Sequence, residues 1–93
     1  MMRVNFYATL RDIVGVASVE VDLEPGSSAQ QLIESVVAEH PGLETALLDE
    51  SGHLHEYLKM FINGREVVYL EEQFQHVLQP PDTVDLFPPV GGG

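Results

Sequence analysis

The sequence contains no cysteine, and only four of its 93 residues are basic. Without cysteine the chain has no disulfide, no thiolate metal ligand and no side-chain thiol that could carry sulfur or an acyl group. The four basic residues face fifteen acidic ones, which gives a formal net charge of −11 at pH 7. Phosphate backbones and anionic lipids repel such a surface. We therefore expect no nucleic-acid or membrane partner, whereas a basic groove on another protein would attract the chain.

Long apolar runs and a phosphate-binding loop are also missing. No apolar segment approaches the length that spans a membrane, and no apolar signal segment precedes the first strand-like alternation. We therefore expect a cytoplasmic protein. The internal glycines are isolated and no Gly-Lys-Ser or Gly-Lys-Thr element occurs, so the sequence does not predict an ATP-using enzyme.

The composition is sufficient for one compact core. Hydrophobic residues make up 44% of the chain and charged residues 20%, which is typical of a globular protein and not of a disordered one. A length of 93 residues is close to that of a single small domain. We expect residues 1–93 to form one domain.

The first half of the chain predicts two strands and a helix. Apolar and polar residues alternate over residues 4–10 and again over 18–23, as in half-buried strands. Ser28, with a glutamine three residues later, fits a helix N-cap, and apolar residues at helical spacing follow it. Pro41 disfavours helical geometry in the residue before it, so the helix is expected to end near residues 39–40.

The second half predicts three further strands. Residues 42–56 give no firm assignment, but residues 57–62 and 66–68 read as strands joined at Asn63-Gly64, a dipeptide typical of a tight hairpin. Residues 83–87 alternate once more as a last strand. The order of elements predicts an α+β domain in which the first and last strands are central neighbours.

The C-terminal segment is the most informative part of the sequence. Pro88 and Pro89 lack backbone donors, so strand pairing is expected to end there and residues 87–93 to form a flexible tail. Three glycines without Cβ atoms can enter a narrow channel, and the functional group that they deliver is the terminal carboxylate. Such a carboxylate needs activation, most simply as an acyl-adenylate made by a partner that uses ATP and Mg²⁺. The alternative is a frayed, inert end.

Three segments carry a family resemblance that spans nearly the whole chain: residues 4–11 (VNFYATLR), 61–67 (FINGREV) and, most specifically, 82–93 (DTVDLFPPVGGG). At these residues the sequence resembles the MoaD/ThiS family, the ubiquitin-like sulfur carriers. The resemblance implies a β-grasp fold, with a mixed sheet of four to five strands and one main helix across one face. It also implies a carrier that binds no cofactor itself and is not an enzyme.

The resemblance further implies how the tail would act. An E1-like enzyme would adenylate Gly93, and sulfur from a persulfide donor would then replace one carboxylate oxygen to give a thiocarboxylate. The large subunit of molybdopterin synthase, in molybdenum cofactor biosynthesis, is the expected acceptor; cysteine, thiamine and tRNA thiolation pathways are alternatives. Two further alternatives are a protein modifier conjugated through Gly93 and an interaction module with an inert tail. The residues expected to contact partners are Gly92, Gly91, Val90, Pro89, Phe87 and Phe61.

Some side chains allow two interpretations. Phe61 and Phe87 have the opposite strand parity to the predicted core residues, so they lie either on an exposed partner-binding face or in a second minor core under the connector. His53 and His55 match no standard metal spacing and are expected to be solvated loop residues, so no metal site is predicted. Lys59, the only lysine of the sequence, is expected on a solvent face.

Overall fold

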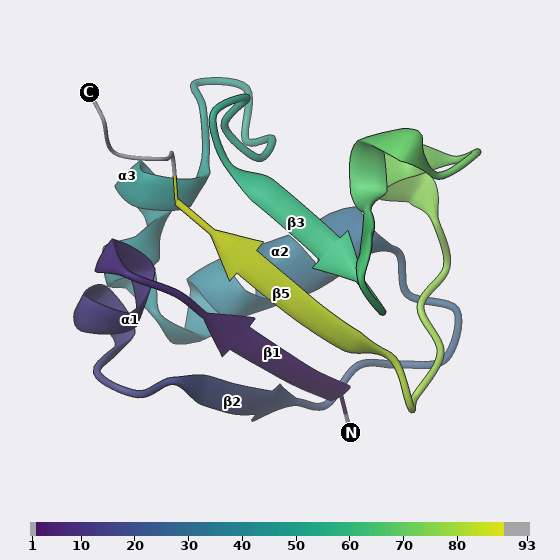
Figure 1. Ribbon diagram of the computed structural model, residues 1–93, viewed down its shortest axis with the longest axis horizontal. Coiled ribbons are helices and arrows are strands. Elements are labelled where there is room, and N and C mark those ends of the chain that lie inside the picture. The colour runs from purple at the N-terminus through teal and green to yellow at the C-terminus, as the bar shows by residue number, and fades with distance from the viewer. Residues whose placement is uncertain (1, 89–93) are drawn as a thin grey trace.

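The computed structural model describes residues 2–88 (Figure 1). A long helix crosses one face of a mixed sheet, with shorter helices at the sheet's ends. The predictions for Pro89, Val90 and Gly91–Gly93 concern residues outside the described part. The elements are β1 (Met2–Phe6), α1 (Thr9–Val14), β2 (Ser18–Val21), α2 (Ala29–Glu39), η1 (Pro41–Leu43), α3 (Glu44–Leu47), β3 (Lys59–Ile62), β4 (Arg65–Glu66), η2 (Val67–Tyr69), η3 (Gln73–Gln75) and β5 (Thr83–Phe87).

The sheet has five strands in the order β2-β1-β5-β3-β4. β1 and β5 run parallel, with Val4 level with Val84, and the remaining neighbours are antiparallel. The first and last strands are thus central neighbours, and the predicted α+β class is confirmed. This topology brings the last strand to the middle of the sheet (Figure 1).

Helix α2 begins at a reciprocal cap that the sequence predicts. The Ser28 hydroxyl accepts a hydrogen bond from the Gln31 backbone N–H at 3.2 Å, and the Gln31 side-chain oxygen accepts one from the Ser28 N–H at 2.8 Å. These bonds satisfy backbone donors that a helix start otherwise leaves free. The helix ends at Glu39, before Pro41, as expected.

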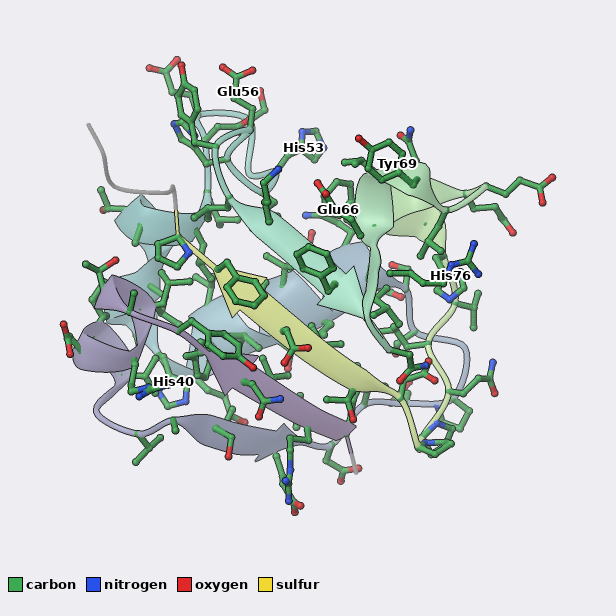
Figure 2. The ribbon with its side chains drawn as sticks, in the orientation of Figure 1. His40, His53, Glu56, Glu66, Tyr69 and His76 are labelled. Atoms are coloured by element: carbon green, nitrogen blue, oxygen red, sulfur yellow. The ribbon has the colours of Figure 1, made fainter. Side chains whose placement is uncertain are left out.

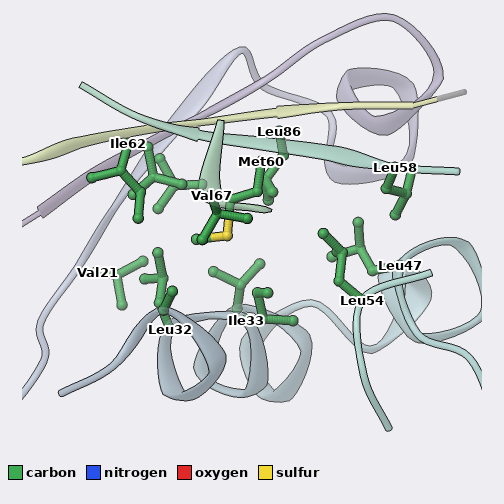
Figure 3. Packing of buried hydrophobic residues seen from close by; sticks show 14 of the residues in the cluster. Val21, Leu32, Ile33, Leu47, Leu54, Leu58, Met60, Ile62, Val67 and Leu86 are labelled. Atoms are coloured by element: carbon green, nitrogen blue, oxygen red, sulfur yellow. The ribbon is translucent and has the colours of Figure 1, made fainter. Parts of the chain in front are cut away.

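The core lies between α2 and one face of the sheet (Figure 3). Alternate residues of the central strands point toward the helix because strand side chains have a period of two. The opposite face carries the remaining residues of each strand, and α2 does not cover it (Figure 1). We call this second face the open face. The central-strand residues in the core are Val4, Phe6, Met60, Ile62, Val84 and Leu86, and those of α2 are Ala29, Leu32, Ile33 and Val36.

The structure corrects the predicted first strand. β1 ends at Phe6, and helix α1 occupies residues that continue the strand-like alternation. Ala8 has φ 52°, which breaks the strand, and Gly15 closes the helix in the left-handed conformation at φ 90°. Leu10 is nevertheless buried, because the helix directs it into the core.

The predicted β3–β4 hairpin is confirmed, but its strands are shorter than expected. Asn63 and Gly64 have φ values of 51° and 85°, the combination that a tight hairpin turn requires. β3 starts at Lys59 and β4 ends at Glu66, after which the chain forms the 3₁₀ turn η2.

The remaining segments form short turns around the sheet. Residues 42–56, which give no firm assignment from sequence, contain the end of η1, helix α3 and a β-bridge between Leu48 and Leu54. The connector between β4 and β5 is tied to the start of α2 by a bridge between Ser28 and Val77. Within residues 2–88, no helix has the length and apolar content required to cross a bilayer.

Candidate functional site

The candidate site is the end of β5, from which the chain continues toward the C-terminal glycines. Phe87 is the last residue of β5 and pairs with Lys59, which confirms the predicted strand over residues 83–87 and shows that the predicted tail, 87–93, starts one residue too early. The Phe87 ring stacks on the Tyr7 ring, with centroids 4.2 Å apart and planes 12° apart. The Phe61 ring meets Phe87 edge-on at 5.5 Å and 84°.

These rings occupy the open face of the sheet. Phe61 and Phe87 are both half-buried, and neither belongs to the core cluster of the described residues. Their strand parity is opposite to that of Met60 and Leu86, which are buried on the α2 side. The structure therefore places both rings on the uncovered face and not in a second core, while their role in partner binding stays a prediction.

A carboxylate lies among the rings. Asp85 is level with Asn5 on one side and with Phe61 on the other. Its Oδ1 atom accepts a hydrogen bond from Asn5 Nδ2 at 2.8 Å and another from the Tyr7 hydroxyl at 3.1 Å. Desolvation by burial and then the hydrogen bond and the charge of Asp85 raise the pKa of Tyr7, while the Arg11 charge opposes them. Tyr7 is thus held as a neutral donor.

Sequence reasoning did not single out Asn5, Tyr7 or Asp85. Asp85 has the same parity as Phe87 in the last strand, and Asn5 is polar at an open-face position of the first. Because the first and last strands are expected to be neighbours, this shared parity could have predicted that Asn5 and Asp85 lie on the same face of the sheet. The residue-to-residue register, which brings Asn5 level with Asp85, comes from the structure.

Lys59 lies on the open face beside the end of β5, as the sequence predicts. Its side chain is 52% exposed, and its ammonium lies 3.6 Å from Glu66 Oε2. An ion pair this exposed contributes about 0–1 kcal/mol to stability. Lys59 is therefore accessible and weakly held.

The histidines of the described chain do not gather at one place. His40, His53 and His76 lie on separate sides of the molecule (Figure 2). His53 is exposed, as expected for a solvated residue, whereas His55 is half-buried and stacks on Tyr57 with ring centroids 5.0 Å apart. Within residues 2–88, no group of three or more His, Cys, Asp and Glu side chains could hold a metal ion.

The loop that carries His53 and His55 is organised by Asp49. Asp49 Oδ1 accepts hydrogen bonds from the backbone N–H groups of His53, at 3.1 Å, and Ser51, at 2.8 Å. The bond from His53 is the main reason that the pKa of Asp49 is lowered. This carboxylate therefore has a structural role in the turn.

The comparisons with known proteins identify the family. The model of the ThiS family matches residues 4–93, which include most of β1, all of β5 and the C-terminal glycines. This chain belongs to the ThiS family. The predicted resemblance to the MoaD/ThiS carriers is therefore confirmed.

Two named relatives match nearly the whole length of this chain. Small archaeal modifier protein 3 of Haloferax volcanii is 34% identical over 92 residues, which cover 99% of this chain and 98% of that protein. The molybdopterin synthase sulfur carrier subunit of Chlamydomonas reinhardtii is 24% identical over 99% of this chain and 98% of its own length.

Solved structures confirm the β-grasp, ubiquitin-like fold. The crystal structure of SAMP1 from Haloferax volcanii matches with a TM-score of 0.89 and 26% identity, over 99% of this chain and 98% of that one. A chain in the crystal structure of the Amycolatopsis orientalis BexX/CysO complex matches with a TM-score of 0.82 and 26% identity, over the full length of both chains. The ThiS family member described here thus belongs among ubiquitin-like carrier and modifier proteins.

Proposed function

We propose that this chain is a sulfur carrier whose Gly93 carboxylate is adenylated by an E1-like enzyme and converted to a thiocarboxylate. The proposal is carried by the path of β5, which runs through the centre of the sheet and leads directly into Pro-Pro-Val-Gly-Gly-Gly. A rigid strand positions the tail, and the tail delivers one reactive group. The terminal sulfur of a partner's persulfide would displace AMP from the acyl-adenylate to give an acyl disulfide. A second thiol of the partner would then cleave the S–S bond, which releases the thiocarboxylate and leaves a disulfide on the partner. The partner also supplies ATP, Mg²⁺ and the phosphate-binding residues.

The open face is the proposed docking surface for these partners. Tyr7, Phe61 and Phe87 form a continuous aromatic cluster where the tail leaves the sheet. Aromatic residues at the centre of an interface provide much of its binding energy. A partner that covers this cluster would therefore hold the tail at its own active site.

For the acceptor we propose the large subunit of molybdopterin synthase. The 24% identical relative that is a molybdopterin synthase sulfur carrier subunit supports this pathway. The match to a CysO chain supports the cysteine-type carriers as the main alternative, ahead of thiamine and tRNA thiolation. The acceptor is chosen by the partner enzyme, since the fold alone does not determine function.

The intact mass of the purified protein tests the carrier proposal. After incubation with an E1-like enzyme, ATP and a persulfide donor from the same cell, we expect a mass gain equal to sulfur replacing one oxygen. A variant that lacks Gly92 and Gly93 should show no gain, and Glu71→Gln, at an exposed position in the connector away from the tail, should still be loaded. Full loading of the truncated variant would refute the proposal.

A second candidate function is protein modification through Gly93. The 34% identity to small archaeal modifier protein 3 favours it. No lysine or arginine follows Arg65, so trypsin would leave the long peptide 66–93 on a target lysine. A Val90→Arg variant would shorten this remnant to three glycines, which mass spectrometry detects readily. Lysines carrying Gly-Gly-Gly in cells that express this variant would support modification, and their absence from cells with a loaded carrier would count against it.

A further inference from the structure

The Asp85 carboxylate has one oxygen that the fold does not use. Both internal donors, Asn5 Nδ2 and the Tyr7 hydroxyl, reach the same atom, Oδ1, at 2.8 and 3.1 Å. Among residues 2–88, no side chain donates a hydrogen bond to Oδ2. Within the same residues, Lys59 pairs with Glu66 and no basic side chain forms an ion pair with Asp85. An ionised carboxylate has about four acceptor positions, so two bonds leave it under-used.

The surroundings of this carboxylate are aromatic. Phe61 is its cross-strand neighbour on β3, Phe87 is two residues further along β5, and Tyr7 both donates to it and stacks on Phe87. Phe61 meets Phe87 edge-on, so the rings frame the carboxylate on a half-buried surface. A planar cation can lie against such rings while it donates to the carboxylate.

We propose that Asp85 and the surrounding rings bind an arginine side chain of the partner protein that docks on the open face. This inference rests on the proposed function in so far as a partner must dock there. Arginine fits better than lysine for two reasons. Its guanidinium presents donors in a planar fork that suits a carboxylate, and it stacks on aromatic faces, whereas the lysine ammonium is a compact, strongly hydrated charge.

Charge complementarity supports a partner as the source of this arginine. The chain carries a net charge of −11 and has only three arginines, at positions 3, 11 and 65. Partial burial of a carboxylate in an interface is costly unless an opposite charge pairs with it there. The arginine would therefore offset the cost of burying the Asp85 charge, and it would make a partner with this arginine bind the open face more tightly than a partner with a neutral side chain there.

NMR titration of the isotope-labelled protein, without any activating enzyme, tests the inference. The probes are the N-acetyl, N-methylamide derivatives of arginine, of citrulline, which has the same shape without the charge, and of lysine. We expect arginine to cause saturable shifts of the Asn5 side-chain amide and the Tyr7, Phe61 and Phe87 ring signals, with Kd on the order of 10 mM. Citrulline should cause none, and lysine should bind several-fold more weakly.

Matched variants separate the two parts of the site. Asp85→Asn keeps an acceptor for Asn5 and Tyr7 but removes the charge, and should weaken arginine binding about tenfold. Glu71→Gln, which changes the net charge equally at an exposed position in the connector, should leave binding unchanged. Phe61→Leu keeps an apolar side chain without a π face and should reduce the preference for arginine over lysine.

Three results would overturn the inference: equal binding of lysine and arginine, equal binding of citrulline, or unchanged binding in Asp85→Asn. Self-association that accounts for the shifts would overturn it as well, because a second copy would then be the occupant. Failure here differs from failure of the carrier proposal. A protein that gains the thiocarboxylate but does not bind the arginine probe loses the arginine site alone, whereas a protein that binds the probe but is never loaded loses the carrier role.

Discussion

At the scale of single residues, Tyr7 links the stability of the fold to alkaline pH. Desolvation and the hydrogen bond to Asp85 raise the pKa of Tyr7 above its ordinary value of 10.0. Because the folded-state pKa exceeds the unfolded one, the stabilisation is complete below the unfolded pKa and is lost as pH rises through the folded pKa. We expect the urea midpoint to fall above pH 10 in the wild type and to fall less in Tyr7→Phe. In Tyr69→Phe, at a residue that is 80% exposed, the urea midpoint should fall with pH as steeply as in the wild type. If the midpoint of Tyr7→Phe also fell as steeply as that of the wild type, this account would be contradicted.

Asn63 provides a second test at this scale. Its Nδ2 donates to Asp82 Oδ1 at 2.8 Å, and its Oδ1 accepts from the Thr83 N–H at 3.0 Å, so it joins the hairpin turn to β5. Asn63→Asp would place two carboxylates together, and we expect a loss of about 1–3 kcal/mol at pH 7 by urea denaturation. Asn63→Gly, which tolerates the φ of 51° but repels nothing, should lose less. The difference between the two variants should close near pH 3, and a constant difference would exclude charge repulsion as its cause.

Single residues also show where prediction from sequence ends. Strand parity placed Phe61 and Phe87 on the face opposite the core, because side chains alternate with a fixed period. Parity could not select the partners of these rings, since Tyr7 lies 80 residues away from Phe87 in sequence. That contact depends on the register between β1 and β5, which is set by packing of the whole core.

At the scale of elements, α1 shows how a correct burial pattern can accompany a wrong assignment. Leu10 continues the alternation of Val4 and Phe6 and is buried as they are. It reaches the core from a helix, however, and Leu10 and Val14, four residues apart, both contact the core cluster. A six-residue helix offers too few turns for its period to be recognised, and the positive φ of Ala8 that starts it has no sequence signal.

The cap of α2 was predictable because it is local, and it gives an element-scale test. Ser28→Ala should destabilise the protein by about 1 kcal/mol, since it removes the acceptor of the Gln31 N–H. Gln31→Ala removes the reciprocal bond, and the double variant should lose less than the sum because the two bonds share one geometry. Chemical denaturation of the four proteins gives the coupling energy. Strict additivity would mean that the two bonds act independently.

At the scale of the whole molecule, the fold and the chemistry have different sources. The sheet order follows from a hydrophobic pattern that many sequences share, which is why the α+β class could be predicted. The proposed reaction depends on a few C-terminal residues, and their meaning came from the sequence motif and not from periodicity. Neither the hydrophobic pattern nor the C-terminal motif specifies the partner, since the choice of partner depends on surfaces that belong to other proteins.

The net charge leads to a prediction for the entire chain. A formal charge of −11 is spread over a body with a radius of gyration of 12.2 Å. Two unit charges at that separation in water repel by about 0.3 kcal/mol before screening. The Debye length is about 30 Å at 0.01 M salt and about 8 Å at 0.15 M, so salt should relieve this repulsion. We expect the urea midpoint to rise with NaCl over this range.

Charge variants decide whether repulsion is the cause of that rise. Glu71→Gln with Glu72→Gln removes two exposed acidic groups and should raise stability at 0.01 M salt by about 1 kcal/mol or less, while reducing the salt-dependent rise. Arg65→Gln makes the net charge more negative and should have the opposite effect on both quantities. The differences in stability between these variants and the wild type should become small at 0.15 M salt, where the Debye length of about 8 Å is shorter than the molecule. A midpoint that falls as salt is added would instead mean that attractive ion pairs, of which Lys59–Glu66 is one, outweigh repulsion in the folded state.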